Sequence, residues 1–179
     1  PGRWVIVDDG STDSTAKIVE KYSRCYPWLQ CLHRTREPHQ SYFSSNVSAI
    51  SQGYRWLHSM ADKWDLLAIL DADIELPPSY YSAIAALFRR NPCLGIASGH
   101  CLDRVGERLR RNLYDWRAAP KGIMVFRHAC YLDIDGFVPL DCTGEDTLAC
   151  YMARSKGWIT WASTGLLAIH NKPLDGDRK

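Results

Sequence analysis

The amino-acid sequence predicts an α/β fold in which a mostly parallel sheet is flanked by helices. Short apolar runs typical of strands alternate with segments of helical periodicity along the 179 residues, as in parallel α/β sheets. Residues 67–70 are apolar throughout, which favours a strand covered on both faces. Acidic residues follow several of these runs, and ligands of α/β proteins gather at the carboxyl ends of strands.

The first half of the chain contains the predicted strands that lead to acidic residues. Residues 3–7 are predicted to form a strand that runs into Asp8. A helix follows, which Thr12 or Asp13 can cap and Pro27 stops. The remaining elements predicted here are a strand at 28–32, a loop at 33–45, a helix at 47–60 and a strand from 66 that leads to Asp71.

The second half continues the alternation of strands and helices. Pro77 and Pro78 can open a helix, and Gly136 and Gly157 can end two others. The elements predicted here are helices at 79–90, 127–133 and 147–156, strands at 95–99, 121–126, 158–162 and 166–169, and a basic segment at 104–112.

Composition indicates one soluble globular domain. The net charge of +2, from 22 basic and 20 acidic residues, does not indicate nucleic-acid binding. No apolar run approaches the length of a membrane span and no signal-peptide pattern is seen, so we expect a cytoplasmic protein, at most peripheral at the inner membrane surface. The seven cysteines form no Cys-x-x-Cys pair, and we expect reduced, mostly buried thiols.

Asp71 and Asp73 are the first candidates for ligand binding. An isolated Asp-x-Asp is often only a solvated loop. Here the pair follows a predicted buried strand, a position that suits Mg2+ or Mn2+ because these hard cations prefer oxygen ligands and complete their shells with substrate phosphates.

Two further acidic groups have both a functional and a structural interpretation. Asp8 and Asp9 can accept hydrogen bonds from a ribose or a base, and Gly10 allows close approach to the backbone, whereas Asp13 is expected only to cap the helix. Glu145 and Asp146 precede a predicted helix, where acids complement the helix dipole, but one of them could also act as a general base.

These groups, in this order, resemble the family 2 inverting glycosyltransferases of GT-A fold, in their bacterial-type, non-processive form. The resemblance covers nearly the whole chain and is carried by four segments: Val7 to Asp13, Leu70 to Asp73, Gly122 to Arg127 leading into Asp135-Gly136-Phe137, and Gly144 to Asp146. It implies a metal-dependent enzyme that moves a sugar from a nucleoside-diphosphate sugar donor to a hydroxyl of a glycan or lipid-linked acceptor, in glycan or polysaccharide biosynthesis.

The resemblance also implies roles for single residues. Asp8, Asp9, Gly10, Asp71 and Gly122 would bind the nucleotide-sugar. Asp73, Asp71 and His170 would hold the metal, although a lone histidine is as often structural. Asp146 would be the base and Glu145 would support it. Residues 1–99 would form the donor and metal half, and residues 100–179 the acceptor and catalytic-base half.

Two surface features have weaker functional interpretations. Arg104, Arg108 and Arg111 fall at helical spacing, which favours a solvated face but could form a cradle for an anionic acceptor such as a lipid-linked diphosphate. Trp116 lies in a polar segment and is the tryptophan best placed to stack on a sugar, although most tryptophans at such positions pack in or near the core.

The sequence departs from the family pattern at its start, and also in the segment from Asn46 to Gly53, which has Ser51 where Asn is usual. Family members normally begin with a strand and helix ahead of the Asp-Asp-Gly-Ser strand, and here only seven residues precede Asp8. We therefore expect a chain that lacks this unit, with self-association or a partner covering the exposed sheet edge. The Gln-x-x-Arg-Trp signature of processive synthases is absent after Asp146, which predicts transfer of a single sugar.

Two alternatives remain at the level of sequence. A nucleotidyltransferase would also use a metal and a nucleotide, but its glycine-rich basic phosphate loop is not visible. The chain could also be a noncatalytic nucleotide-sugar-binding fragment or an inactive remnant.

Overall fold

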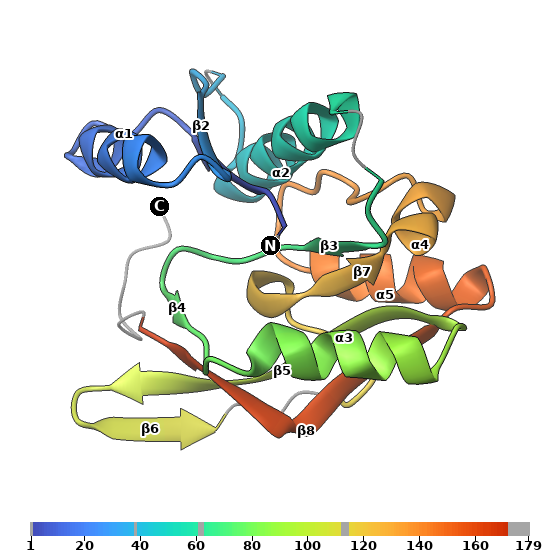
Figure 1. Ribbon diagram of the computed structural model, residues 1–179. Helices are drawn as coiled ribbons and strands as arrows, with labels where there is room; N and C mark the ends of the chain where they lie inside the picture. Colours follow the sequence, from blue (N-terminus) through green and yellow to red (C-terminus); the bar gives the residue numbers. More distant parts are fainter. Residues whose placement is uncertain (1, 38, 61–62, 112–114, 172–179) are drawn as a thin grey trace. The chain divides into compact units, whose positions relative to one another are not determined.

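The computed structural model describes residues 2–37, 39–60, 63–111 and 115–171 (Figure 1). The chain folds into two compact units. Unit 1 comprises Pro1–Lys63 and Pro139–Thr143, and unit 2 comprises Trp64–Val138 and Gly144–Lys179.

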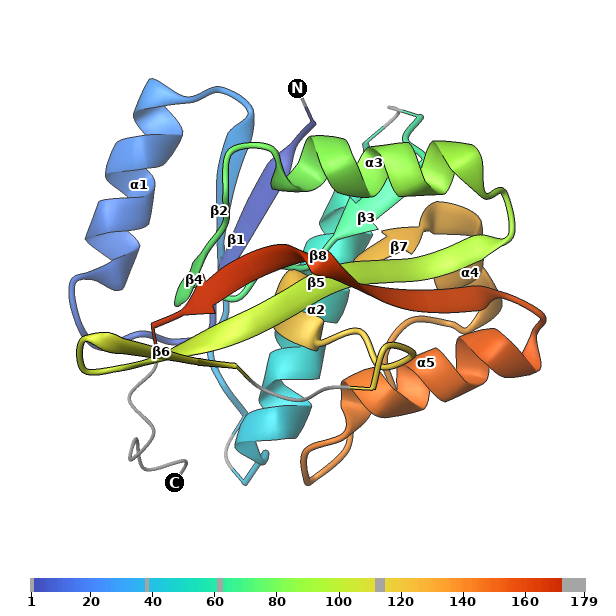
Figure 2. The ribbon, with the colours of Figure 1, turned by 90° about the horizontal axis from the view of Figure 1, so that it is seen from below.

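Unit 1 is built on two parallel strands. Strands β1 (Trp4–Asp8) and β2 (Leu29–His33) pair in register from Trp4 with Leu29 to Asp8 with His33. Helices α1 (Thr15–Cys25) and α2 (Tyr42–Ser59) lie on opposite sides of this pair (Figures 1 and 2). The carboxyl ends of both strands, with their acidic and basic residues, therefore meet at one edge.

Local capping fixes where the two helices of unit 1 begin. The carboxylate of Asp13 accepts a hydrogen bond from the backbone N–H of Thr15, at 2.9 Å, and so satisfies a donor at the start of α1. Ser41 precedes α2 and its side chain accepts from the N–H of Ser44. Asp13 thus contributes to capping as predicted, but the N-cap residue is Ser14, so the helix starts one residue later than an N-cap at Asp13 would place it.

Unit 2 is built on a six-stranded sheet with strand order β3-β7-β5-β8-β4, and β6 pairs with β5. Strands β5 and β8 pair in parallel, and the other four pairings are antiparallel. The strands are β3 (Leu66–Ala68), β4 (Ile74–Glu75), β5 (Leu94–Val105), β6 (Arg108–Arg111), β7 (Val125–Arg127) and β8 (Ile159–His170). The helices are α3 (Tyr80–Arg90), α4 (His128–Asp133), α5 (Glu145–Ser155) and the single 3-10 turn η1 (Lys121–Ile123).

Helix α3 covers the core of unit 2 and also anchors the turn η1. Its buried residues Tyr80, Ile84 and Phe88 recur at a spacing of four and pack against β5. The buried Tyr80 hydroxyl donates to the carbonyl of Ile123 at 2.9 Å and accepts from the N–H of Gly99 at 2.8 Å. Burial raises the pKa of Tyr80, so the phenol stays protonated and holds η1 against β5.

The sheet differs from the sequence expectation because it is mixed rather than mostly parallel. The predicted strand at 121–126 is the turn η1 followed by the short β7, which returns antiparallel to both β3 and β5. The two strands expected at 158–162 and 166–169 form one strand, β8, with irregular register against β5. Unit 1 keeps the predicted parallel pairing.

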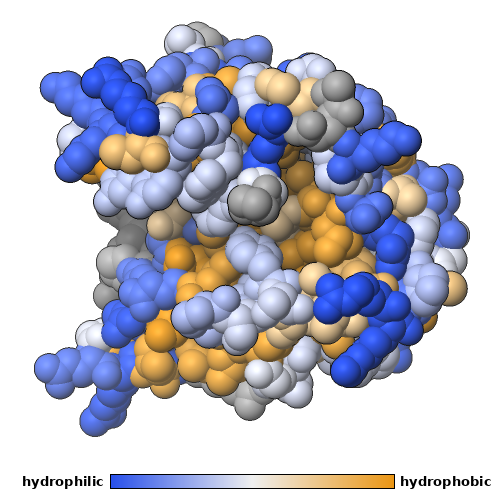
Figure 3. Space-filling model, in the orientation of Figure 1, coloured by the Kyte–Doolittle hydropathy of each residue, from blue (hydrophilic) through white to orange (hydrophobic). Residues whose placement is uncertain are grey.

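The basic segment at 104–112 is a hairpin, which corrects the predicted helical face. Val105 pairs with Arg108 across a two-residue turn, and Gly106 at its first position has φ of +59°, the region glycine favours in tight hairpins. Arg104 and Arg108 therefore lie on opposite faces of a β-ribbon rather than on one helix face. The hairpin tip is hydrophilic, at the lower left of Figure 3.

The described residues include all seven cysteines and all of the helices named above. All seven cysteines are unpaired thiols, and three of them, Cys101, Cys130 and Cys150, are buried, fewer than expected. Of the helices in the described ranges, none is long and apolar enough to span a membrane.

Candidate functional site

Asp8 lies at the carboxyl end of β1 and is held in its ionised form. The side chain is buried, and its oxygens accept from the Ser11 N–H at 3.0 Å and lie 3.1 Å from Nδ1 of His33. The hydrogen bonds from Ser11 and the neighbouring His33 outweigh burial and lower the pKa of Asp8 below its usual value. With both oxygens engaged, Asp8 shapes the acidic loop more than it faces solvent.

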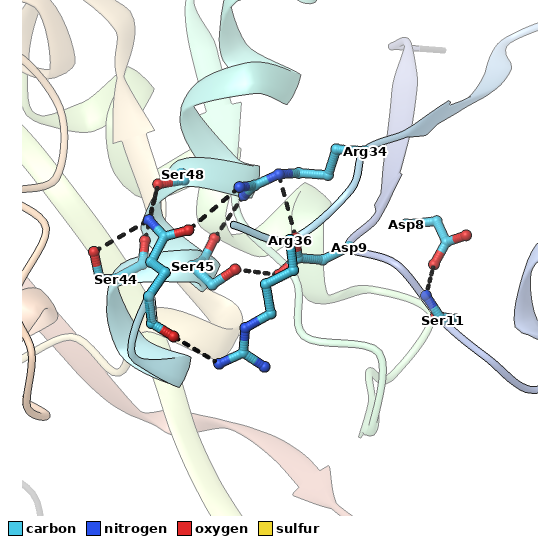
Figure 4. A network of polar contacts seen from close by, with 9 residues as sticks. Asp8, Asp9, Ser11, Arg34, Arg36, Ser44, Ser45 and Ser48 are labelled. Atoms are coloured by element: carbon cyan, nitrogen blue, oxygen red, sulfur yellow. Dashed lines mark hydrogen bonds and ion pairs between the residues drawn. The ribbon is translucent and has the colours of Figure 1, made fainter. Parts of the chain in front are cut away.

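Asp9 is engaged by two side chains of unit 1 (Figure 4). Ser45 on α2 donates its hydroxyl to Oδ2, and Nε of Arg34 lies 3.2 Å from Oδ1. This second contact is an ion pair without an aligned hydrogen bond, so the buried Oδ1 accepts none among the described residues. Arg34 also donates to the carbonyl of Ser45 at 2.9 Å and thus ties the Asp9 loop to α2.

Gly10 follows Asp9 with φ of +79°, a backbone conformation that favours glycine. A Cβ there would make only ordinary contacts with the backbone of Arg34 and Arg36. The backbone angle, rather than crowding, therefore accounts for glycine at this position.

Asp71 in unit 2 lies against the turn η1. Regular β3 ends at Ala68, but the N–H of Ile69 donates to Met124 O at 2.8 Å and the N–H of Asp71 to Gly122 O at 3.0 Å. A Cβ on Gly122 would lie 2.9 Å from Oδ2 of Asp71, so glycine there leaves space for the carboxylate. Burial raises the pKa of Asp71, which Lys121 partly offsets.

Lys121 joins η1 to the two acids at the start of α5. Its ammonium donates to Oε1 of Glu145 at 2.9 Å, and its backbone N–H donates to Oδ2 of Asp146 at 3.3 Å. Burial works against the charge of Glu145, but the hydrogen bond from Lys121 and that from the Gly144 N–H outweigh it, so the pKa of Glu145 is lowered. Glu145 is thus a buried ion-pair partner, whereas Asp146 is partly exposed.

Asp73 lies at the other end of the Asp-x-Asp pair and meets the predicted His170. Oδ2 of Asp73 is 3.3 Å from Nε2 of His170, and Nδ1 of His170 is 3.0 Å from Oδ1 of Asp103. The antiparallel pairing of β4 with β8 brings the two predicted residues together, since Ile74 pairs with His170. Asp103 was not predicted as a site residue.

The separation of Asp73 and His170 is compatible with two ligand atoms of one divalent cation. Two ligand atoms bound to one cation at right angles, with bonds of about 2.1 Å, lie about 3 Å apart, close to the separation of Nε2 and Oδ2. In the described residues no group of three or more His, Cys, Asp or Glu side chains has the arrangement of a metal site. The metal role of Asp71, Asp73 and His170 therefore stays a prediction.

Two of the other predicted surface residues, Arg104 and Trp116, have structural partners. Arg104 donates to Asn171 Oδ1 at 2.7 Å and pairs with Glu75 at 3.3 Å. The Trp116 ring is 46% exposed and contacts the Trp161 ring, with centroids 5.3 Å apart, and the guanidinium of Arg117 lies over it. The side chain of Arg111 lies outside the described residues.

Within each unit, the structure therefore gathers most of the predicted residues at the ends of strands and at one helix start. Asp8, Asp9 and Gly10 share a loop in unit 1. In unit 2, Asp71 and Gly122 lie together with Lys121, Glu145 and Asp146, and Asp73 lies with His170. Five residues with direct contacts to these groups are not predicted by the sequence: His33, Arg34, Ser45, Lys121 and Asp103.

The structure thus combines an α/β fold with acidic residues at strand ends and an acidic pair that opens a helix. The family model described as glycosyl transferase family 2 matches residues 3–137. The chain belongs to this family, which confirms the family resemblance of the sequence. A search of curated protein sequences finds no match.

Solved structures confirm the GT-A fold class. GalNAc-T7 with UDP, GalNAc and Mn2+ aligns over 98% of this chain and 38% of its own, with 14% identity and a TM-score of 0.76. The mannosyltransferase PcManGT from Pyrobaculum calidifontis in complex with GDP-Man and Mn2+ aligns over 97% of this chain and 49% of its own, with 18% identity and a TM-score of 0.70. The chain thus spans less than half the length of either protein.

Proposed function

We propose that the chain is the nucleotide-sugar and catalytic part of an inverting, non-processive glycosyltransferase. The single observation that carries the proposal is the turn η1, which contacts both the donor-side acid and the acceptor-side acids of unit 2. Gly122 accommodates Asp71, while Lys121 binds Glu145 and Asp146. One short turn thereby links the residues that would bind a diphosphate-sugar to those that would activate an acceptor.

The donor is proposed to be a nucleoside-diphosphate sugar bound with Mn2+ or Mg2+. The two solved relatives carry UDP or GDP-Man with Mn2+. In this chain Asp73 and His170 would hold the cation, with diphosphate oxygens and water completing its shell and Asp71 facing the donor. The bound cation would stabilise the charge that develops on the leaving diphosphate. Asp8, Asp9 and Gly10 would contact the nucleoside.

Asp146 is proposed as the general base. It would take the proton of the acceptor hydroxyl while that oxygen attacks the anomeric carbon, and the bond from this carbon to the diphosphate oxygen breaks on the opposite side. A single base suffices for this displacement, which inverts the anomeric configuration. Glu145, held by Lys121, keeps the start of α5 and hence Asp146 in position.

The acceptor is proposed to be a hydroxyl of a glycan or lipid-linked sugar in polysaccharide assembly, with residues 1–99 supplying the donor half and residues 100–179 the acceptor half. The supporting observation is the exposed Trp116 beside Trp161, since aromatic rings can stack on sugars. The missing processive signature supports transfer of one sugar.

Removal of the divalent cation is expected to abolish turnover. With UDP- and GDP-sugars as donors, nucleoside diphosphate release should occur with Mn2+ and fall to background with EDTA. Asp73→Ala should lower turnover at subsaturating Mn2+ in the same assay, and Glu107→Gln, in the exposed hairpin turn, serves as the control. Nucleotide binding in calorimetry without turnover would favour a noncatalytic binder, and undiminished turnover in EDTA would contradict the proposal.

Gly122→Ala is expected to weaken donor binding without unfolding the protein. The new Cβ would displace the Asp71 carboxylate, and loss of a hydrogen bond to a charged group costs about 1.5–3 kcal/mol, or about 10-fold to 150-fold in Kd. The carboxylate can rotate, so the free energy of unfolding should change by less than about 1 kcal/mol. Calorimetry with the nucleoside diphosphate measures the first effect and denaturant unfolding the second.

Gly165→Ala is the matched control for this substitution. Gly165 lies in β8 of the same unit, and a Cβ there would have one neighbour, at 4.0 Å. Equal nucleotide affinity in Gly122→Ala and Gly165→Ala would contradict a donor-binding role for Asp71.

A further inference from the structure

At one end of the unit 2 sheet, His170 lies between two carboxylates. Its Nε2 is 3.3 Å from Asp73 and its Nδ1 is 3.0 Å from Asp103. Asp103 is 7% exposed, and the proposed mechanism gives it no role. Asp73, His170 and Asp103, from three segments, are thus linked by polar contacts, and the imidazole of His170 contacts both carboxylates.

The sheet register fixes this arrangement. His170 pairs with Asp103 across the parallel strands β5 and β8, and with Ile74 across the antiparallel strands β4 and β8. The N–H of Asn171 extends the second ladder by donating to the carbonyl of Asp73 at 2.8 Å. Figure 2 shows β4, β8 and β5 side by side at this end. Because paired residues point to the same face of a sheet, Asp103 meets the imidazole directly.

The opposite face of the same sheet end carries a separate polar cluster. Arg104 follows Asp103 in β5, and it binds Glu75 of β4 and Asn171, the residue after His170. Asn171 also donates to Glu75 at 3.0 Å. Neighbouring residues of a strand alternate between faces, so this cluster secures the same three segments from the other side. Glu75 therefore provides a control for effects on the sheet end as a whole.

We propose that Asp103 is a positioning residue: by accepting the hydrogen bond from Nδ1 of His170, it fixes the imidazole with Nε2 directed to the cation that His170 shares with Asp73. The inference rests on the proposed function, in which Asp73 and His170 bind the cation. It adds Asp103, which would affect the cation by orienting His170. A histidine that binds a metal through one nitrogen donates through the other, and a carboxylate partner both orients the ring and raises its basicity.

The burial of Asp103 explains why a carboxylate suits this role. A buried carboxylate needs donors, and the imidazole supplies one at 3.0 Å. An amide of the same size can also accept a hydrogen bond but carries no charge, so it would orient the ring less firmly and leave Nε2 a weaker ligand.

A double-mutant cycle on Mn2+ binding tests the inference without relying on turnover. Calorimetry and the electron paramagnetic resonance signal of free Mn2+ would give the Kd of Mn2+, with the nucleoside diphosphate present, for the unchanged chain, Asp103→Asn, His170→Gln and the double variant. Loss of an outer carboxylate typically costs about 10-fold to 100-fold in metal affinity. We expect that loss in Asp103→Asn and no further loss when Asp103→Asn is added to His170→Gln.

Two controls separate positioning from general damage. Glu75→Gln disturbs the opposite face and should leave the Kd of Mn2+ within about twofold, and thermal unfolding shows whether each variant is folded. Asp103→Glu keeps the charge and should retain part of the affinity for Mn2+. It replaces Asp103→Asn as the test if that variant does not fold.

The inference would be overturned if Asp103→Asn bound Mn2+ like the unchanged chain, if its loss persisted in the His170→Gln background, or if the unchanged chain bound no Mn2+. Absence of sugar transfer alongside the expected pattern of Mn2+ affinities would instead contradict the proposed function and leave the role of Asp103 intact.

Discussion

Replacing Asp146 with Asn is expected to lower kcat for sugar transfer by about 100-fold to 10,000-fold, the usual contribution of a general base. The amide cannot take the proton of the acceptor hydroxyl, whereas donor binding does not depend on this proton transfer. Kd for the nucleoside diphosphate should therefore stay within about threefold. Steady-state transfer kinetics and nucleotide calorimetry on the same preparation give the two values.

Asp146→Asn is also expected to remove one hydrogen bond at the start of α5. Asp146 uses one oxygen for the Thr147 N–H at 2.7 Å and the other for the Lys121 N–H at 3.3 Å. Asparagine has a single carbonyl oxygen, so one bond is lost at a cost of about 1 kcal/mol in the free energy of unfolding. Glu107→Gln, which neutralises an exposed carboxylate of unit 2, is the matched control. Equal kcat in both variants would rule out Asp146 as the base.

The acidic positions could be predicted from sequence because each follows or precedes a recognisable element. Asp8 and Asp71 come after apolar runs, and Glu145 opens a periodic segment ended by Gly157. These are local signals. The partners Arg34, Lys121 and Asp103 carry no local signal, because Arg34 is 25 residues from the Asp9 it binds and Lys121 is 24 residues from Glu145.

Sheet direction was harder to predict for the same reason. Residues 121–126 are mostly apolar and were expected to form a strand, but Pro120 and Gly122 allow the 3-10 turn that the Tyr80 hydroxyl then holds. Alternating strands and helices favour parallel pairing, yet β7 reverses direction because it returns between β3 and β5 after this turn. The arginine spacing suits a helix, but Gly106 allows the tight turn that makes this segment a hairpin.

Replacing Lys121 with Met is expected to destabilise the protein by about 3–5 kcal/mol at neutral pH, because it leaves the buried Glu145 charge without its ion-pair partner. The side chains of Lys121 and Glu145 are only 12% and 6% exposed. Denaturant unfolding measures the loss. The exposed pair of Arg24 and Glu20, 83% and 51% exposed and 4.0 Å apart, is the control, and Arg24→Met should cost less than about 0.5 kcal/mol.

The pH dependence of this effect has a defined sign. The folded-state pKa of Glu145 is lowered, so its ionised form contributes stability above the ordinary pKa of 4.5, and that contribution is lost as the pH falls through the folded-state pKa. Without Lys121, the opposing effect of burial is expected to dominate and raise the pKa of Glu145, so the variant should gain stability on protonation. The difference in unfolding free energy between the two proteins should therefore shrink as the pH falls, first above pH 4.5 as Glu145 of the variant takes up its proton, and further below pH 4.5 as Glu145 of the unchanged protein does.

Combining Lys121→Met with Glu145→Gln tests whether the destabilisation arises from the unpaired charge. The double variant has no buried carboxylate at this position, so it should recover most of the loss, and its unfolding free energy should lack the pH dependence that Glu145 contributes. If the double variant were as unstable as Lys121→Met at neutral pH, the unpaired charge would not be the cause. The Lys121 side chain would then stabilise unit 2 through packing, and the ion pair would not be what connects η1 to the start of α5.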